Sequence, residues 1–560
     1  MIWIEIAALI ALQIQDGYRA LKVFQQCHYH IDRYRDWIIE RISLAAAVRR
    51  IAHYLPFLLF LLVKDAQARS GSIICIILIY LSMKLRAVKT GGASLRFTAR
   101  ARWLIIVLLA ADAAVTAFIR TQLSIELYIC LIPLLCGVGI YFTLKLDFIQ
   151  IRRFGLAVKS TFGGLTLHGE RAGKQGMSSF QSLATAIAAQ VGTGNLAGAA
   201  TAIAMGGPGA IFWMWIAAFF GMATIFAEAV LAQTYKTTDD QGHVTGGPAY
   251  YISKGLGSKK LAAFFSISII IALGFIGNMV QSNSIADAFQ TAFSLPPLLI
   301  GVIISALAAF VFFGGMGRIA AFTEKVVPIM AALYLLGGLI VLLANASHII
   351  PALKMVFVGA FDPAAATGGI IGAGVKEAMR YGVARGLFSN EAGMGSTPHA
   401  HAVAKVKYPA QQGFVAIVGV FVDTFIVLNM TAFVIFVTNS IDGSTTGIAL
   451  TQKAFESGLG SFGITFVAIC LFFFAFSTII GWYFFGEQNI KYLFGTKGTT
   501  PYRLIVMGFI VLGSVLQVDL VWELADMFNG LMVLPNLIAL IGLSKIVSMA
   551  LRDYDANNPR

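Results

Sequence analysis

Two stretches of this chain place glycine and polar residues inside apolar runs long enough to cross a bilayer. The first is QVGTGNLAG, residues 190–198, within an apolar segment from 180 to 205, and the second is GVARGLFSNEAGMGS, residues 382–396. A glycine in a helix interior costs about 1 kcal/mol. An unpaired backbone amide in hydrocarbon costs several kcal/mol more, so a broken helix persists there only where protein or a ligand satisfies the freed groups. Both stretches therefore predict interrupted membrane helices.

The chemistry available at such a break comes from the backbone. Unwinding exposes carbonyl oxygens that can coordinate a desolvated cation, and the half-helix that begins near Gly194 directs its positive dipole end toward an anion. A zwitterion with a carboxylate, accompanied by Na⁺, meets both demands. The alternative is that the glycines only permit close helix packing. Two breaks at the same position in each half of the chain favour the ligand interpretation.

Ionisable side chains at membrane depth are further candidates for function. The candidates are Glu228, Asp287, Glu324, Glu391 and Asp423. Glu391 lies within the second break, where it either takes part in function or caps the half-helix that follows. Glu228, Asp287 and Glu324 lie near predicted span ends, where a water-exposed or ion-paired role is expected.

Two histidines follow the sixth predicted core span. His399 and His401 are expected at the cytoplasmic surface, and we do not interpret them as a metal site despite their spacing.

The composition identifies the elements that must position these residues. Of the 560 residues, 58% are hydrophobic and 12% charged, which is typical of an all-α polytopic membrane protein. We predict a leading helix at 127–146 followed by ten core spans. The core spans are 178–200, 208–234, 261–292, 296–314, 318–346, 367–396, 411–438, 460–490, 502–518 and 524–548.

Lys and Arg concentrate in alternate loops of this arrangement, which predicts a cytoplasmic C-terminus. Ten spans divide into two sets of five, and an odd number per set gives the second set the opposite orientation. The predicted domains are an extra membrane region (1–122), a leading helix and basic connector (123–177), two five-helix repeats (178–346 and 347–550) and a cytoplasmic tail (551–560). The net charge of +14 fits these topology signals, so no nucleic-acid partner is expected.

Three motifs resemble the signature stretches of the alanine or glycine:cation symporter family, also called sodium:alanine symporters. They are GGPGAIFWMWIAAFFG (206–221), GNMVQSNSIADAF (277–289) and RGLFSNEAGMGSTPHAHA (385–402), and the resemblance covers residues 132–548. It implies a five-plus-five inverted-repeat sodium symporter core preceded by one helix. It also implies symport of small neutral amino acids such as alanine or glycine, coupled to Na⁺ or in some members to H⁺, in a bacterial cytoplasmic membrane.

The resemblance of VGTGN to the unwound motif of the wider sodium symporter superfamily implies residue roles. The amides of Thr193 and Gly194 in the Gly192–Asn195 segment would hold the substrate carboxylate, with side-chain contacts from Gln190 and Asn195. The Na⁺ ligands would be the carbonyls of Ala188 and Val191 and the hydroxyls of Ser477 and Thr478, all hard oxygen donors. The alternative for the two hydroxyls is a bond back to their own helix. The implied pocket wall consists of Phe388, Asn390, Met394 and Trp482.

Residues 1–122 depart from the family pattern. They weakly resemble the membrane-anchoring region of some bacterial cell-wall Mur ligases, notably in LRFTARARWLI, and could contact another membrane protein. The alternative function is therefore a non-transporting, amino-acid-binding membrane scaffold or sensor linked to cell-wall assembly. An enzyme is not expected, because the sequence contains no P-loop and no recognisable nucleophile and base set.

Overall fold

Apolar α-helices build almost all of the described chain. The computed structural model describes residues 124–163, 176–362, 374–516 and 518–558, all within one unit, Phe118–Arg560. Seven helices in this described part are long and apolar enough to cross a membrane, as the composition predicts. The predictions for residues 1–122 lie outside the described residues.

The core helices follow the predicted order of two sets of five. In the first set an interrupted helix, α9 (Ser179–Gln190) with the π-helix η2 (Gly194–Gly198) and α10 (Ala199–Gly206), is followed by α11 (Gly209–Thr234), α13 to α14 (Lys259–Phe293), α15 (Pro297–Phe312) and α16 (Gly315–Ala344). In the second set an interrupted helix, α19 (Val375–Asn390) and α20 (Pro398–Ala402), is followed by α21 to α22 (Pro409–Val437), α24 (Phe462–Phe494), α25 (Thr499–Val515) and α26 (Val518–Gly542). A broken helix therefore begins each set.

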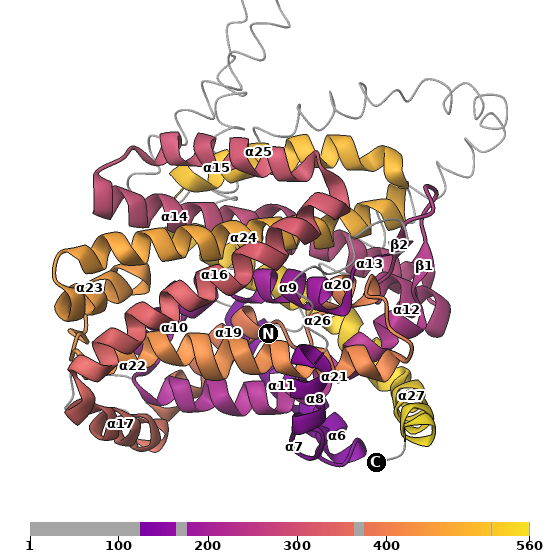
Figure 1. Cartoon of the computed structure of the whole chain (residues 1–560), viewed down its shortest axis with the longest axis horizontal. Coiled ribbons are helices and arrows are strands. Elements are labelled where there is room, and N and C mark those ends of the chain that lie inside the picture. The colour runs from indigo at the N-terminus through magenta and orange to yellow at the C-terminus, as the bar shows by residue number, and fades with distance from the viewer. Residues whose placement is uncertain (1–123, 164–175, 363–373, 517, 559–560) are drawn as a thin grey trace, which may run out of the picture. The chain divides into compact units, whose positions relative to one another are not determined.

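Corresponding helices of the two sets pack against each other. The second helices of the two sets, α11 and α21, are in contact. The third helices, α14 and α24, and the fourth helices, α15 and α25, are also in contact. Figure 1 shows α14 and α24 side by side beneath α15 and α25.

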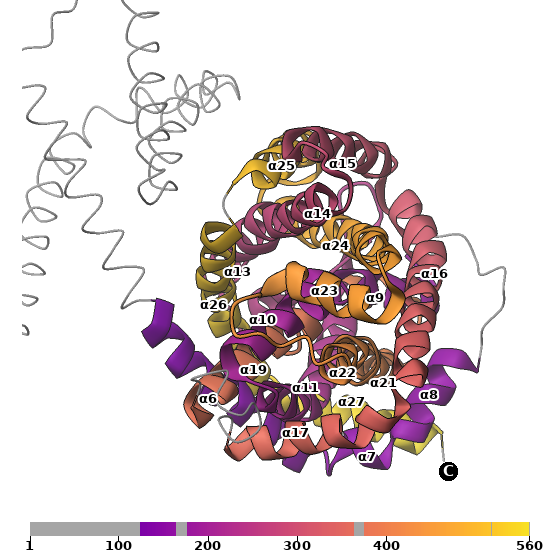
Figure 2. The ribbon, with the colours of Figure 1, turned by 90° about the vertical axis from the view of Figure 1, so that its left-hand side faces the viewer.

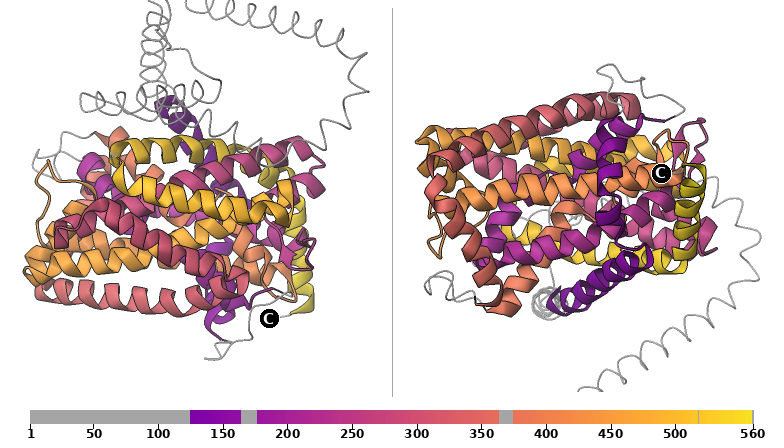
Figure 3. Two further views of the ribbon diagram at one scale, coloured as in Figure 1. Left: turned by 90° about the horizontal axis from the view of Figure 1, so that it is seen from above. Right: turned by 60° about the horizontal axis from the view of Figure 1, so that its bottom comes forward.

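The interrupted helices occupy the interior of the bundle. In Figure 2, α9 and α10 lie between α24 on one side and α11 and α21 on the other, and the packing contacts agree. Figure 3 shows the same bundle from above and with its bottom turned forward. The breaks are thus surrounded by protein, where their freed backbone groups can find partners.

The segments between the core helices contain further helices that the sequence does not predict. The largest are α17 (Ile349–Phe361) and α23 (Gly447–Leu459). The last predicted span, 524–548, crosses the end of α26, and the predicted boundary at residue 550 falls inside α27 (Ser544–Asn557). The leading helix α6 (Ser124–Lys145) precedes two short helices, α7 (Ile149–Arg152) and α8 (Phe154–Phe162).

The loop after α11 forms a small antiparallel hairpin. Its strands are β1 (Thr237–Thr238) and β2 (Val244–Thr245), and the short helix α12 (Pro248–Gly255) follows.

Candidate substrate and cation site

The first helix break lies where the sequence predicts it. Helix α9 ends at Gln190, and Val191 has an extended conformation with φ −85° and ψ 92°. At Gly192 a Cβ atom would meet Thr478 Oγ1 at 2.3 Å, so any other residue there would displace the Thr478 side chain. The chain then turns into η2, which runs directly into α10.

The freed amides of this break have side-chain partners. The Gly192 N–H donates to Asn195 Oδ1 at 3.0 Å, and the Thr193 N–H donates to Gln281 Oε1 at 3.1 Å. Gln281 lies on α14 (Asn278–Phe293) and is buried. Its role was not predicted, although a glutamine inside an apolar span is itself a signal. One of the amides predicted to hold a carboxylate thus already donates to an amide oxygen.

The second break is shorter than predicted. Helix α19 continues to Asn390, and the irregular segment is 391–397, with left-handed backbone at Glu391 (φ 58°), Gly393 (φ 87°) and Gly395 (φ 80°). Gly382, predicted within the break, lies inside α19. A Cβ there would meet Ala210 O of α11 at 2.3 Å, so this glycine permits close helix packing.

Glu391 ends the preceding helix rather than beginning the next. It is the C-terminal cap residue of α19 and is fully buried. Its carboxylate accepts hydrogen bonds from Trp482 Nε1 on α24 and from Ser396 Oγ at the end of the break. Of the two alternatives for Glu391, capping of the following half-helix is therefore wrong, and Glu391 instead ties the second break to the predicted pocket wall.

A buried carboxylate lies between the two broken helices. Asp423, on the π-helix η5 (Phe421–Leu428), accepts from Asn195 Nδ2 at 2.7 Å, from Ser389 Oγ at 2.9 Å and from Thr424 Oγ1 at 2.9 Å. Gln190 completes the link between the breaks, because its Nε2 donates to Asn390 O at 2.7 Å. The predicted residues Gln190, Asn195 and Asn390 thus belong to one hydrogen-bonded cluster.

The four oxygens predicted as cation ligands converge. Thr478 Oγ1 lies 2.9 Å from Ala188 O and 3.4 Å from Val191 O, and Ser477 Oγ lies 3.5 Å from Ala188 O. Both hydroxyls also contact Phe474 O of their own helix, at 2.8 Å from Ser477 and 3.0 Å from Thr478. Back-bonding and the contact across to α9 therefore coexist, and the oxygen-only donor set suits a hard cation.

The predicted pocket wall is aromatic and buried. The rings of Phe388 and Trp482 meet edge to face at 5.7 Å between centroids, and Phe388 also contacts Trp522 at 4.8 Å. Trp482 packs against Gly277, where a Cβ would meet the indole at 2.6 Å. Met394 is buried, with 3% of its surface exposed. The contacts of Trp522 and Gly277 were not predicted, although Gly277 begins the motif 277–289, because the motif does not show which ring packs against this glycine.

Three expectations about ionisable residues are wrong. Glu228 is fully buried rather than water-exposed or ion-paired, and it accepts the N–H groups of Gly393 and Gly395. His399 and His401 are also buried, each with 1% of its surface exposed. The reason is that α20 continues the second broken helix within the bundle, where α9 and α11 cover it. Glu324 and Asp287 are half-buried, and Glu324 accepts from Gln181 Nε2 at 3.0 Å.

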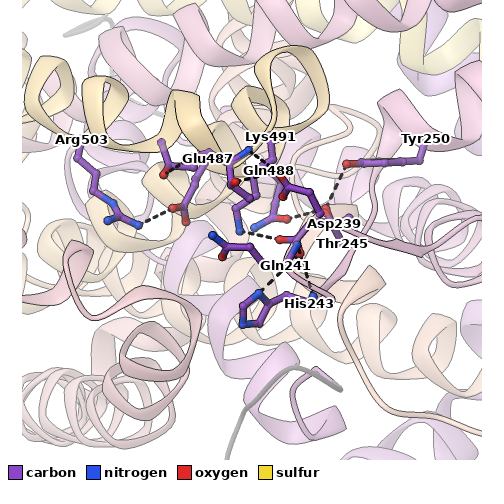
Figure 4. Close-up of polar contacts among 12 residues, drawn as sticks. Asp239, Gln241, His243, Thr245, Tyr250, Glu487, Gln488, Lys491 and Arg503 are labelled. Atoms are coloured by element: carbon purple, nitrogen blue, oxygen red, sulfur yellow. Dashed lines mark hydrogen bonds and ion pairs between the residues drawn. The ribbon is translucent and has the colours of Figure 1, made fainter.

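A polar cluster joins the β1–β2 hairpin to the C-terminal end of α24 (Figure 4). Asp239 Oδ2 lies 3.5 Å from Lys491 Nζ, and Thr245 Oγ1 donates to Gln488 Oε1 at 2.7 Å. Burial alone would raise the pKa of Asp239. The hydrogen bond from the His243 N–H, the Lys491 charge and the Gln241 N–H outweigh burial, so the pKa lies below its ordinary value. The charged form of Asp239 therefore fastens the hairpin.

A second ion pair lies in the same region. Arg503 donates to Glu487 Oε1 at 2.9 Å and to the Tyr483 hydroxyl at 2.9 Å. The end of α24 thus carries fixed charges that hold both the hairpin and α25.

Comparison with known proteins assigns the chain to a family. The sodium:alanine symporter family matches residues 112–560. An uncharacterized transporter of Haemophilus influenzae is 44% identical over 76% of this chain and 92% of its own length. The sodium/alanine symporter AgcS of Methanococcus maripaludis is 44% identical over 74% of this chain and 92% of its own length. The probable sodium/glutamine symporter GlnT of Bacillus subtilis is 43% identical over 76% of this chain and 87% of its own length. The chain, a polytopic membrane transporter and not an enzyme, belongs to the sodium:alanine symporter family.

Proposed function

We propose that this symporter couples inward movement of Na⁺ to uptake of a small neutral amino acid such as alanine or glycine. The observation that carries the proposal is the convergence of the Ala188 and Val191 carbonyls with the Ser477 and Thr478 hydroxyls beside the first helix break. A continuous helix and a broken helix thus share one group of oxygens. A cation bound there would link α24 to α9 and so bias the shape of the break.

The carboxylate of the amino acid would take over the amides at the start of η2. The Thr193 N–H now donates to the amide oxygen of Gln281, and a carboxylate oxygen is a stronger acceptor of the same bond. The half-helix that begins at Gly194 adds its positive dipole end. We assign this subsite to Gly192, Thr193 and Gly194. The substrate carboxylate would replace Gln281 Oε1 as the acceptor of the Thr193 N–H.

The remaining predicted residues would limit the side chain of the substrate. Phe388 and Trp482 form a rigid edge-to-face pair, and Glu391 fixes the indole through its N–H. Met394 belongs to the same break as Glu391. Such a wall favours a substrate whose side chain is a methyl group or hydrogen over one with a branched side chain. Aromatic rings packed against their neighbours can be displaced only at a cost in free energy.

The proposal also covers the coupling ion and the orientation of the chain in the membrane. H⁺ is the alternative coupling ion, because Glu391 and Asp423 place carboxylates at membrane depth. The end of α24 that carries Lys491 faces the cytoplasm of a bacterial cell, together with the C-terminus, since Lys and Arg collect in the loops on this side. The exposed apolar side chains of α15 and α16 face lipid.

Uptake of labelled alanine and ²²Na⁺ into proteoliposomes tests the proposal. We expect alanine uptake only with an inward Na⁺ gradient, inhibition by unlabelled glycine, and little inhibition by leucine. Glutamine belongs in the same competition series because of the relative named for it. Equal competition by leucine, or uptake indifferent to both Na⁺ and pH, would contradict the assignment.

A further inference from the structure

Glu228 places a carboxylate inside the helix bundle, on a helix that carries none of the predicted ligand residues. It lies on α11, the first helix after the first break, and is fully buried. Burying a carboxylate is costly unless hydrogen bonds compensate. An apolar side chain would fill the same space without that cost, so the contacts of Glu228 should explain why a carboxylate stands there.

Those contacts fasten the second break. Glu228 Oε2 accepts the Gly393 N–H at 3.0 Å, and Oε1 accepts the Gly395 N–H at 2.9 Å. Both glycines have positive φ, so their amides do not point along a helix and cannot find carbonyl partners by continuing one. A single carboxylate satisfies two alternate amides of the irregular segment with its two separate oxygens, which an apolar residue could not do.

A third donor links this carboxylate to another helix. Asn536 Nδ2 on α26 donates to Glu228 Oε1 at 2.6 Å and to Gly393 O at 2.9 Å. The Tyr251 hydroxyl of α12 donates in turn to Asn536 Oδ1. Asn536 and Tyr251 are fully buried as well. The network therefore joins α11, the second break, α26 and α12, and all three direct contacts of Glu228 are donated to it.

The segment held in this way also carries predicted pocket residues. Glu391, the partner of the Trp482 indole, precedes the two glycines, and Met394 lies between them. The cation oxygens belong instead to α9 and α24. A change at Glu228 should therefore disturb the amino acid pocket more than the cation site.

From this arrangement we propose that Glu228 is a positioning residue for amino acid binding. Its carboxylate holds the second break in the shape that presents Glu391 and Met394 to the pocket, and it does not touch the substrate. The proposal rests on the proposed function and deepens it. Without the Glu228 carboxylate, the Gly393 and Gly395 amides would need other acceptors. Glu391 would then no longer be held in the position from which it accepts the Trp482 N–H.

Glu228→Gln is the test variant, and Glu456→Gln is the matched control. The glutamine keeps one acceptor oxygen but turns an amide group toward a backbone N–H, so one charge-assisted bond is lost. Glu456 is exposed on α23. We expect the apparent alanine affinity of Glu228→Gln to fall by about tenfold or more, which is the size expected for one such bond. The Na⁺ concentration for half-maximal uptake, measured at saturating alanine, should change less than about threefold.

A second variant keeps the test decisive if Glu228→Gln does not fold. Asn536→Ala removes the third donor and leaves both glycine bonds in place, so it should lower alanine affinity in the same direction by a smaller factor. Equal loss of alanine and Na⁺ affinity in the folded variants, or unchanged alanine affinity, would overturn the proposal. If the unsubstituted protein shows no Na⁺-dependent alanine uptake, the proposed function fails instead, and the two failures are therefore distinguishable.

Discussion

The Thr478 hydroxyl lies 2.9 Å from the carbonyl oxygen of Ala188, and this contact joins the continuous helix α24 to the last turn of the broken helix α9. The two residues are 290 positions apart in the chain. Ser477 approaches the same carbonyl from the preceding position. A ligand that binds these oxygens therefore acts on the interface between the two helix sets.

Replacement of Ser477 and Thr478 together with alanine should lower the apparent Na⁺ affinity by about tenfold or more, because two oxygen ligands with roughly 1.5–3 kcal/mol each are lost. Alanine affinity should fall at low Na⁺ and recover at saturating Na⁺, since two ligands that bind cooperatively share one coupling free energy. Binding of labelled alanine across a Na⁺ series measures both effects.

The matched control for this pair is Ser457→Ala, an exposed serine on α23 that bonds to its own helix. Alanine binding that no Na⁺ concentration restores would place the pair in the amino acid pocket. An unchanged Na⁺ dependence would mean that the hydroxyls only bond back to Phe474.

Gly192→Ala should disrupt the first break more severely than any loss of a side chain there. The new methyl group would meet Thr478 Oγ1 at 2.3 Å and Gln281 Oε1 at 3.1 Å, so the predicted cation ligand and the partner of the Thr193 amide must both move. We expect Na⁺-dependent uptake to fall at least about tenfold, with an overpacking cost of about 1–3 kcal/mol in stability. Gly508→Ala on α25, where a Cβ would meet no atom within 4 Å, is the control. Normal uptake by both variants would show that the backbone at Gly192 is not part of the site.

The sequence predicts the first break more accurately than the second. At 190–198, glycines and polar residues occur together in an otherwise apolar run, and the helix breaks there. In the second stretch, Gly382 resembles the glycines of a break but packs against Ala210 of α11 inside a regular helix. A glycine that permits unwinding and one that permits close packing look the same in a sequence, because only the neighbouring helix distinguishes them.

The partners of buried polar groups were not predictable for the same reason. Glu228 receives its hydrogen bonds from glycines 165 and 167 positions later, and Thr193 binds Gln281 of a different helix. By contrast, the approach of Ser477 and Thr478 to Ala188 follows the family resemblance, which already contains the tertiary arrangement. Residue type indicates that a buried polar group needs a partner, but the fold decides which one.

Removal of residues 1–122 should leave most of the transport activity intact. The relatives align with about three quarters of this chain while spanning nearly all of their own length, as AgcS does with 74% and 92%. The described core also supplies its own partners to both breaks. Alanine uptake by the truncated and full-length proteins, normalised to the amount inserted, measures the effect. A correctly inserted truncation that binds alanine but cannot transport it would show that the extension takes part in the mechanism.

The ion pair between Asp239 and Lys491 should stabilise the hairpin against the end of α24. Their side chains are 5% and 15% exposed, so solvent screens the pair less than it would at an open surface. We expect Asp239→Asn and Lys491→Met each to lower the melting temperature in detergent. A double-mutant cycle should give a coupling energy of about 1 kcal/mol.

The same pair predicts a direction of pH dependence. The pKa of Asp239 is lower in the folded protein than its ordinary value of 3.8, so its contribution to stability is fully present above that value and is lost as the pH falls through the folded pKa. The stability deficit of Asp239→Asn should therefore stay constant between about pH 5 and 8 and shrink only in strong acid. Glu456→Gln serves as the exposed control. A deficit that disappears near neutral pH would contradict this prediction, because the pKa of Asp239 lies below its ordinary value.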